Sequence, residues 1–123
     1  MTRPEAEDPR LVALSKICLG LPEAERKVTG QHADFRVRGR VFAYFLSNHH
    51  GDGIVAVCTR LALGENADLV AGDPVRYYLP AYIGPRGWVG LRLDLGEVDW
   101  QLVREMIDAS YRMVAPARLV QQL

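Results

Sequence analysis

The first element that the sequence predicts is an amphipathic helix close to its start. Apolar residues recur there at the spacing of a helix, at Leu11, Leu14, Ile17, Cys18 and Leu21. Asp8 can cap this helix, Pro9 suits its first turn, and Gly20 marks its end. We therefore expect a helix from about residue 9 to residue 19, preceded by a flexible tail at residues 1–7.

An alternating pattern follows and predicts a β-hairpin. Phe35 and Val37 alternate with arginines, and a second apolar run begins after a bend at residues 38–40, where a glycine lies between two arginines. Residues 22–34, ahead of the hairpin, are mostly polar and are expected to form a connector.

The second half of the chain predicts shorter strands and a long last helix. The expected elements are a strand at residues 54–59, a short helix ending at residue 72, strands at 75–79 and 88–94, and a helix at about 100–114. Asp99 can cap the last helix and Pro116 ends it. Its apolar stripe consists of Trp100, Val103, Ile107, Tyr111 and Val114.

The order of these elements predicts an α+β fold. Strands and helices do not alternate strictly, so a parallel sheet is disfavoured. We expect one antiparallel sheet of about five strands, packed with an N-terminal and a C-terminal helix in the order α-β-β-β-α-β-β-α. The length of 123 residues suits a single domain over residues 1–123.

Composition and charge narrow the possible partners. Fifteen basic and fifteen acidic residues give a net charge of zero, so a nucleic-acid site would require cations gathered on one surface. Cys18 and Cys58 lie in apolar stretches and are expected to be buried thiols rather than a disulfide. No signal-peptide pattern and no bilayer-length apolar run occurs. We expect a cytoplasmic protein with no membrane partner and no cofactor, with a monomer favoured.

Three stretches resemble the MmcQ/YjbR family of small bacterial proteins. They are GQHADFRVRGRVFAYF, LPAYIGPRGWVGLRLD and VDWQLVREMIDASYRMVAP, and the most specific parts are IGPRGWVGLRL and SYRMVAP. This resemblance implies an α+β, frataxin-like fold. It also implies DNA binding through a double-wing motif.

On this sequence, the resemblance implies wings at the bends of residues 38–40 and 84–87. The residues that would contact DNA phosphates or grooves are Arg38, Gly39, Arg40 and Arg86, with Arg36 and Arg92 extending the surface along the sheet. A structural explanation remains open, because charged residues also collect at solvated hairpin tips and protect sheet edges.

An alternative function rests on aromatic residues around the second bend. Tyr78, Tyr82 and Trp88 could form the surface of a protein-interaction or small-ligand-binding module. Packing across the bend would explain the same residues.

Catalytic and metal-binding patterns are weak. His32, His49, His50 and Asp52 lack the spacing of metal ligands, and the stretch that contains the last three is typical of a polar turn. The sequence contains no nucleophile elbow, phosphate loop or dinucleotide fingerprint. We therefore predict no catalytic residues and no metal ligands.

Overall fold

The computed structural model describes residues 7–123, so the expected tail lies outside the described residues apart from Glu7. The helices are α1 (Pro9–Leu19), α2 (Glu65–Gly72), α3 (Trp100–Val114) and α4 (Ala117–Val120), with short 3-10 turns η1 (His49–Gly51) and η2 (Gly84–Arg86). The strands are β1 (Ala24–Thr29), β2 (His32–Val37), β3 (Arg40–Ser47), β4 (Val55–Arg60), β5 (Tyr77–Tyr78) and β6 (Trp88–Arg92).

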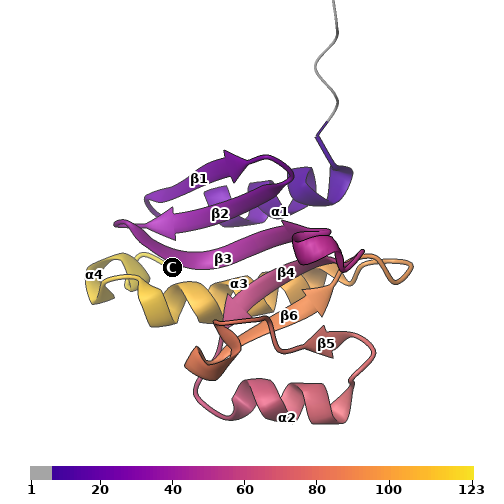
Figure 1. Cartoon of the computed structure of the whole chain (residues 1–123). Helices are drawn as coiled ribbons and strands as arrows, with labels where there is room; N and C mark the ends of the chain where they lie inside the picture. Colours follow the sequence, from indigo (N-terminus) through magenta and orange to yellow (C-terminus); the bar gives the residue numbers. More distant parts are fainter. Residues whose placement is uncertain (1–6) are drawn as a thin grey trace, which may run out of the picture.

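The strands form one antiparallel sheet in the order β1-β2-β3-β4-β6-β5. α1 and α3 pack against the same face of this sheet, and α2 lies beside the edge strand β5 (Figure 1). The predicted α+β fold with a single antiparallel sheet is confirmed, with one strand more than the expected five.

The additional strand is β1, and it corrects the interpretation of residues 22–34 as a connector. β1 pairs with β2 along its whole length, from Ala24 opposite Val37 to Thr29 opposite His32. Its residues are almost all exposed, as expected of an edge strand that carries charged side chains. A strand with neither face buried shows no apolar alternation, so the sequence pattern did not reveal it.

β5 is shorter than the predicted strand at residues 75–79. The Asp73 carbonyl accepts a hydrogen bond from the Tyr77 amide at 3.1 Å, and its carboxylate accepts one from the Arg76 amide at 3.1 Å. These bonds close a turn over residues that would otherwise begin the strand.

Both predicted helix caps are confirmed. The Asp8 side chain accepts a hydrogen bond from the Arg10 amide at 2.8 Å, and the Asp99 side chain accepts one from the Leu102 amide at 3.1 Å.

None of the helices within residues 7–123 is long and apolar enough to cross a membrane.

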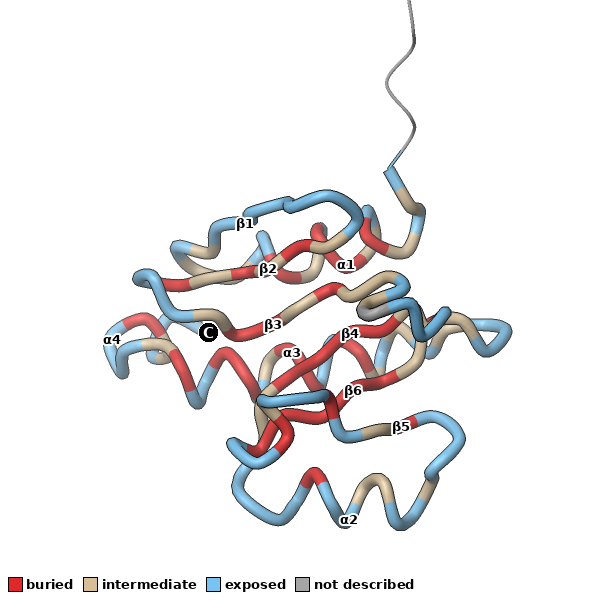
Figure 2. Tube along the Cα trace, in the orientation of Figure 1, coloured by how far each residue is buried: buried red, intermediate tan, exposed pale blue. Residues whose placement is uncertain are grey.

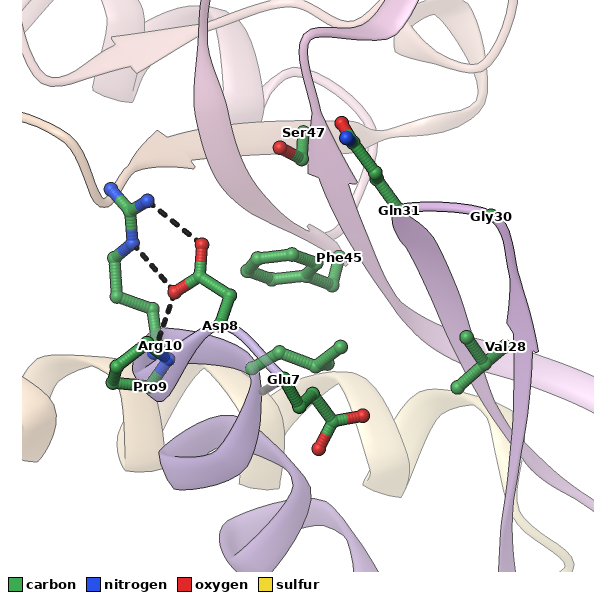
Figure 3. Close-up of a pocket in the computed structure, with 10 residues that line it drawn as sticks. Glu7, Asp8, Pro9, Arg10, Val28, Gly30, Gln31, Phe45 and Ser47 are labelled. Carbon is green, nitrogen blue, oxygen red and sulfur yellow. Dashed lines mark hydrogen bonds and ion pairs between the residues drawn. The ribbon is translucent and has the colours of Figure 1, made fainter. Parts of the chain in front are cut away.

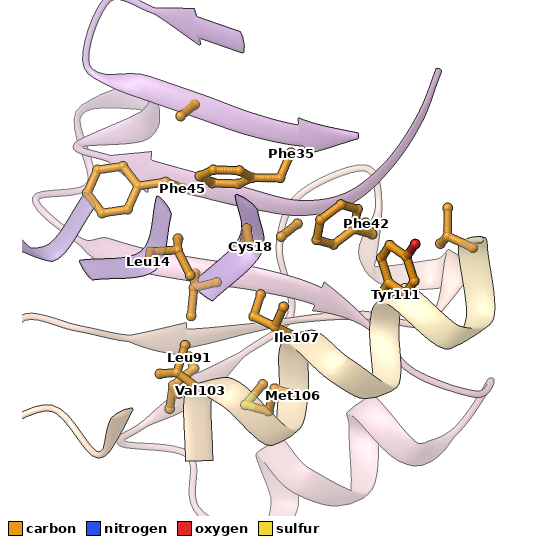
Figure 4. Packing of buried hydrophobic residues seen from close by; sticks show 14 of the residues in the cluster. Leu14, Cys18, Phe35, Phe42, Phe45, Leu91, Val103, Met106, Ile107 and Tyr111 are labelled. Carbon is orange, nitrogen blue, oxygen red and sulfur yellow. The ribbon is translucent and has the colours of Figure 1, made fainter. Parts of the chain in front are cut away.

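The hydrophobic core lies between the sheet and the two long helices (Figure 4). Figure 2 shows the buried stretches concentrated on β2, β3, β4, β6 and α3. Phe42 and Tyr111 meet edge to face at 5.4 Å between ring centroids, and the Tyr111 hydroxyl donates to the Pro22 carbonyl at 2.7 Å. Cys18 and Cys58 are buried free thiols, as predicted.

A bulge in β3 is hydrogen-bonded to one residue of helix α3. Phe35 lies opposite Ala43 but Arg36 lies opposite Val41, so Phe42 is an extra residue and its side chain is also buried. The buried Ser110 hydroxyl of α3 donates to the Phe42 carbonyl at 2.6 Å and accepts from the Arg60 amide at 2.9 Å. The end of β4 is thereby held against both β3 and α3.

Candidate arginine-lined site

The candidate site begins on the face of the sheet opposite α1 and α3 and reaches the C-terminal end of α3 at Val114. The strand register lines up residues of this outer face in one row, consisting of Asp34, Tyr44, Cys58, Gly90 and Tyr78. Arg60 and Trp88 lie opposite each other on the same face, one side-chain position further along β4 and β6. Cys58 and Trp88 are buried on this face as well, so a site can form only where its hollows open to solvent.

Three arginines line one hollow, which we call the arginine hollow and which extends from this face around the ends of the strands to Val114 of α3. It has a volume of about 640 Å³ and is lined by Arg40, Val41, Tyr44, Arg60, Leu63, Ile83, Pro85, Arg86, Trp88 and Val114. Arg40 begins β3, Arg60 ends β4, and Arg86 ends η2. The fold thus gathers cations from three separate parts of the chain.

The charges of the arginine hollow are not neutralised by the described residues. None of its lining residues is acidic, and Arg40, Arg60 and Arg86 make no ion pair with any carboxylate of residues 7–123. The Nε atom of Arg60 is buried and has no hydrogen-bond partner among the described residues. Arg40 and Arg86 are exposed, so Arg60 is the one of the three whose guanidinium is partly desolvated. Guanidinium groups without a carboxylate partner favour the binding of an anion.

A network of hydrogen bonds holds the bend that carries Arg86. The buried Asn66 amide of α2 donates to the Gly84 carbonyl at 2.8 Å and to the Trp88 carbonyl at 3.0 Å. The Gly87 carbonyl accepts from the Leu61 amide at 2.9 Å. The predicted bend at residues 84–87 is therefore a fixed 3-10 turn between β5 and β6 rather than a loose hairpin tip.

Two aromatic rings form part of the wall of the arginine hollow. Trp88 is only 6% exposed, and its ring lies 5.2 Å from that of Tyr44 between centroids. Burial raises the pKa of the Tyr44 phenol, and the positive charges of Arg36 and Arg86 oppose this increase. Trp88 is thus mainly a packing residue, with Tyr44 beside it.

An apolar groove adjoins the arginine hollow. It has a volume of about 310 Å³ and is lined by Tyr44, Leu46, His49, Asp52, Tyr78, Pro80, Ala81, Tyr82 and Ile83. Tyr44 and Ile83 belong to both the apolar groove and the arginine hollow. The ring of Tyr78 lies against Gly90, where a Cβ atom would collide with it.

The aromatic residues of the alternative prediction do not share one site. Tyr78 and Tyr82 line the apolar groove, whereas Trp88 lines the arginine hollow. Burial raises the pKa of Tyr78, and its hydroxyl lies 3.9 Å from the Cys58 sulfur. Burial also raises the pKa of the Cys58 thiol, to about 12.

The other predicted arginines are paired with carboxylates. Arg38 contacts Glu23 at 2.7 Å, and its Nε and Nη2 atoms each donate a hydrogen bond to one carboxylate oxygen. Arg36 contacts Asp34 at 2.6 Å, and Arg92 contacts Asp94 at 2.9 Å. Of the two bends predicted as wings, the structure therefore brings together Arg40 and Arg86, but not Arg38. Gly39 provides the turn between β2 and β3, with φ of 76°.

Arg60 is the site residue that sequence reasoning missed. The only sign of Arg60 in the sequence is its place directly after an apolar strand, which does not mark it as part of a site. Its neighbourhood depends on the register that places it opposite Trp88, and on Ser110, which lies 50 residues later.

A larger pocket lies at the other end of the sheet, near the N-terminus. It has a volume of about 760 Å³ and lies between the start of α1 and the strands that carry Val28, Phe45 and Ser47 (Figure 3). Its charged groups are paired: Asp8 contacts Arg10 at 2.8 Å, and Glu7 contacts Arg26 at 2.8 Å. The paired charges make it a weaker candidate for ligand binding than the arginine hollow.

The histidines have structural contacts in the described part of the chain. His32 Nδ1 accepts a hydrogen bond from the Ser47 amide at 3.2 Å, and the His32 ring meets that of His49 at 5.1 Å. The side chain of His50 lies outside the described residues. The described residues contain no group of three or more His, Cys, Asp or Glu side chains that could hold a metal ion.

Comparisons with known proteins agree with this architecture. The fold is that of a small α+β protein whose antiparallel sheet has helices α1 and α3 on one face and a hollow with three arginines where β3 begins and β4 ends. The chain belongs to the YjbR family, whose model matches residues 19–113. No curated protein matches the chain significantly.

A solved structure shares the fold. The crystal structure of Deinococcus radiodurans protein DR2400, which has the domain DUF419, is similar with a TM-score of 0.70 and 18% sequence identity. The match covers 95% of this chain and 91% of that chain. At this level of identity the similarity shows a common fold.

Proposed function

We propose that this protein binds nucleic acid through its arginine hollow, with Arg40, Arg60 and Arg86 contacting backbone phosphates. The observation that carries this proposal is the convergence of three arginines without acidic partners in one concave site. Arginine forms forked hydrogen bonds with phosphate oxygens and keeps its charge at all physiological pH values.

The geometry supports a modified double-wing arrangement. Arg40 and Arg86 come from the two bends predicted as wings, and Arg60 supplies a third cation from the sheet itself. Arg36, Arg38 and Arg92 contribute less in this proposal, because each would have to leave a carboxylate to contact a phosphate.

Weak binding with little sequence preference is expected. The net charge of the chain is zero, so electrostatic attraction at long range is small and affinity depends on local contacts. Phosphate contacts position a protein without reading the base sequence. The chain acts as a single domain in this proposal, in a reducing cytoplasm in which Cys18 and Cys58 remain free thiols.

A salt titration tests the phosphate contacts. If all three arginines contact phosphates, log affinity for duplex DNA falls with log salt concentration at a slope of about −2.7, or about −0.9 per contact. The triple variant Arg40→Ala, Arg60→Ala, Arg86→Ala is expected to lose most of this slope, measured by fluorescence anisotropy.

Two single variants serve as controls. Arg112 is paired with Asp108 on the solvent side of α3, so Arg112→Ala is expected to leave the slope unchanged. Arg38→Ala is expected to change the slope by less than the roughly 0.9 that one phosphate contact contributes, because Glu23 already neutralises this cation. Binding without salt dependence, or equal binding by the triple variant when circular dichroism shows it folded, would refute the proposed function.

A further inference from the structure

We propose that the apolar groove holds an unpaired nucleobase whose phosphate lies in the arginine hollow, so that single-stranded nucleic acid is the preferred ligand. This inference rests on the proposed function and specifies its ligand. It concerns a second subsite, formed mainly by Tyr44, Tyr78 and Tyr82.

The two subsites adjoin each other and share two lining residues. Tyr44 and Ile83 line both of them, and Arg86 follows Ile83 by three residues in the turn that leads into β6. A ligand with an aromatic part beside an anionic part therefore fits these two subsites. A nucleotide has this combination of groups.

The apolar groove has the walls that a base requires. Three of its lining residues are tyrosines, and Leu46, Pro80, Ala81 and Ile83 complete its apolar surface. Its volume of about 310 Å³ is at the small end of the range for small-molecule sites. Stacking on aromatic rings is sequence-tolerant, because every base has a π-face.

Charge determines which part of the ligand enters which subsite. Asp52 lines the apolar groove, and its carboxylate would repel a phosphate there. The arginine hollow contains three cations and no acidic lining residue. The phosphate is therefore expected in the arginine hollow and the base in the apolar groove.

Tyr82 is the strongest sign of a ligand-binding role. Its side chain is 86% exposed, and its backbone has φ of 67°, a conformation that is unfavourable for a bulky residue. Burial in the core cannot explain a tyrosine at this position, where glycine would be less strained. Backbone strain of this kind tends to persist where a side chain serves a function.

Only an unpaired base can use such a groove. In a duplex, the bases are stacked and paired, and a protein reaches only their edges in the grooves. In a single strand, a base can turn out of the stack and lie against aromatic side chains. The combined site therefore favours single strands over duplexes.

The test compares three forms of one fluorescent oligonucleotide of about 10 nucleotides, a length within the usual site sizes. These forms are the single strand, the same strand annealed to its complement, and an abasic strand of equal length. We expect the single strand to bind the full-length protein about tenfold or more tightly than either other form, because base stacking on one aromatic residue corresponds to about 5-fold to 150-fold in affinity.

Variants at Tyr82 separate binding from folding. Tyr82→Gly removes the ring and suits the backbone, so affinity for the single strand should fall about tenfold while circular dichroism shows the variant folded. Tyr82→Phe keeps the ring and should retain most of the affinity. Both variants should keep the salt slope, because the arginines are unchanged.

The outcomes distinguish this inference from the proposed function. Equal affinity for duplex and single strand, or no loss in Tyr82→Gly, would overturn the base subsite while leaving the phosphate contacts intact. An unchanged salt slope in the arginine triple variant would overturn the proposed function itself. If a mononucleotide competes as well as the unlabelled single strand at the same total nucleotide concentration, the ligand is a free nucleotide and the preference for a strand is overturned.

Discussion

Gly87 is the residue at which the arginine hollow depends most directly on backbone geometry. Its φ is 98°, and a Cβ atom at this position would collide with the carbonyl oxygen of Leu61. The amide of the same Leu61 donates to the Gly87 carbonyl, so the two segments lie in close contact. This contact places Arg86 beside the end of β4.

We predict that Gly87→Ala destabilises the protein by about 1–3 kcal/mol or more, because it combines an unfavourable backbone conformation with a collision. Urea denaturation measures the change. Gly96→Ala is the matched control, since Gly96 has φ of 80° but no atom within 4 Å of the position that a Cβ would take. Equal losses in the two variants would show that the contact with Leu61 contributes nothing.

At the scale of elements, α3 is connected to the sheet by a single buried hydroxyl as well as by its apolar stripe. Ser110 joins the bulge of β3 to the last residue of β4 through hydrogen bonds of 2.6 and 2.9 Å. Because Arg60 is that last residue, the packing of the helix also determines where one cation of the arginine hollow lies.

We predict that Ser110→Ala lowers the free energy of unfolding by about 1–3 kcal/mol, since it leaves a buried amide and a buried carbonyl without this partner. Ser15→Ala is the control: the Ser15 hydroxyl accepts from the partly exposed Arg26 guanidinium, which water can solvate instead. A smaller loss in Ser110→Ala than in Ser15→Ala would contradict this account.

At the scale of the whole molecule, arginine-carboxylate pairs make stability depend on pH. Hydrogen bonds from Arg10, Arg38 and Arg92 hold the pKa values of their partners below the usual range. These partners are Asp8, Glu23 and Asp94. A carboxyl group whose pKa is lower in the folded state contributes stability above its unfolded pKa and loses it as the pH falls through its folded pKa.

We predict that the free energy of unfolding decreases as the pH falls below about 4, near the unfolded pKa of Asp and Glu. Asp94→Asn should weaken this dependence because it removes one of the three groups. Asp68→Asn, at an exposed position on α2, is the control. Urea denaturation at several pH values measures the effect, and an unchanged slope in Asp94→Asn would exclude a contribution from the Arg92 pair.

Local signals in the sequence account for most of the fold. Asp8 and Asp99 cap their helices through bonds to nearby amides, and the turn around Gly39 connects strands that are adjacent in the chain. Such features depend on a few consecutive residues, so they can be inferred from them. β1 was missed because its exposed side chains show no apolar period.

The sequence by itself determined the α+β class, the caps, the central strands and the two arginine-bearing bends. Only the tertiary structure decided which arginines lie together. Arg38 lies two residues from Arg40 in the chain but pairs with Glu23, while Arg40 shares a hollow with Arg60 and Arg86. The physical reason is that ion pairing and site formation depend on strand register and packing between distant segments, whereas caps and turns depend on neighbouring residues.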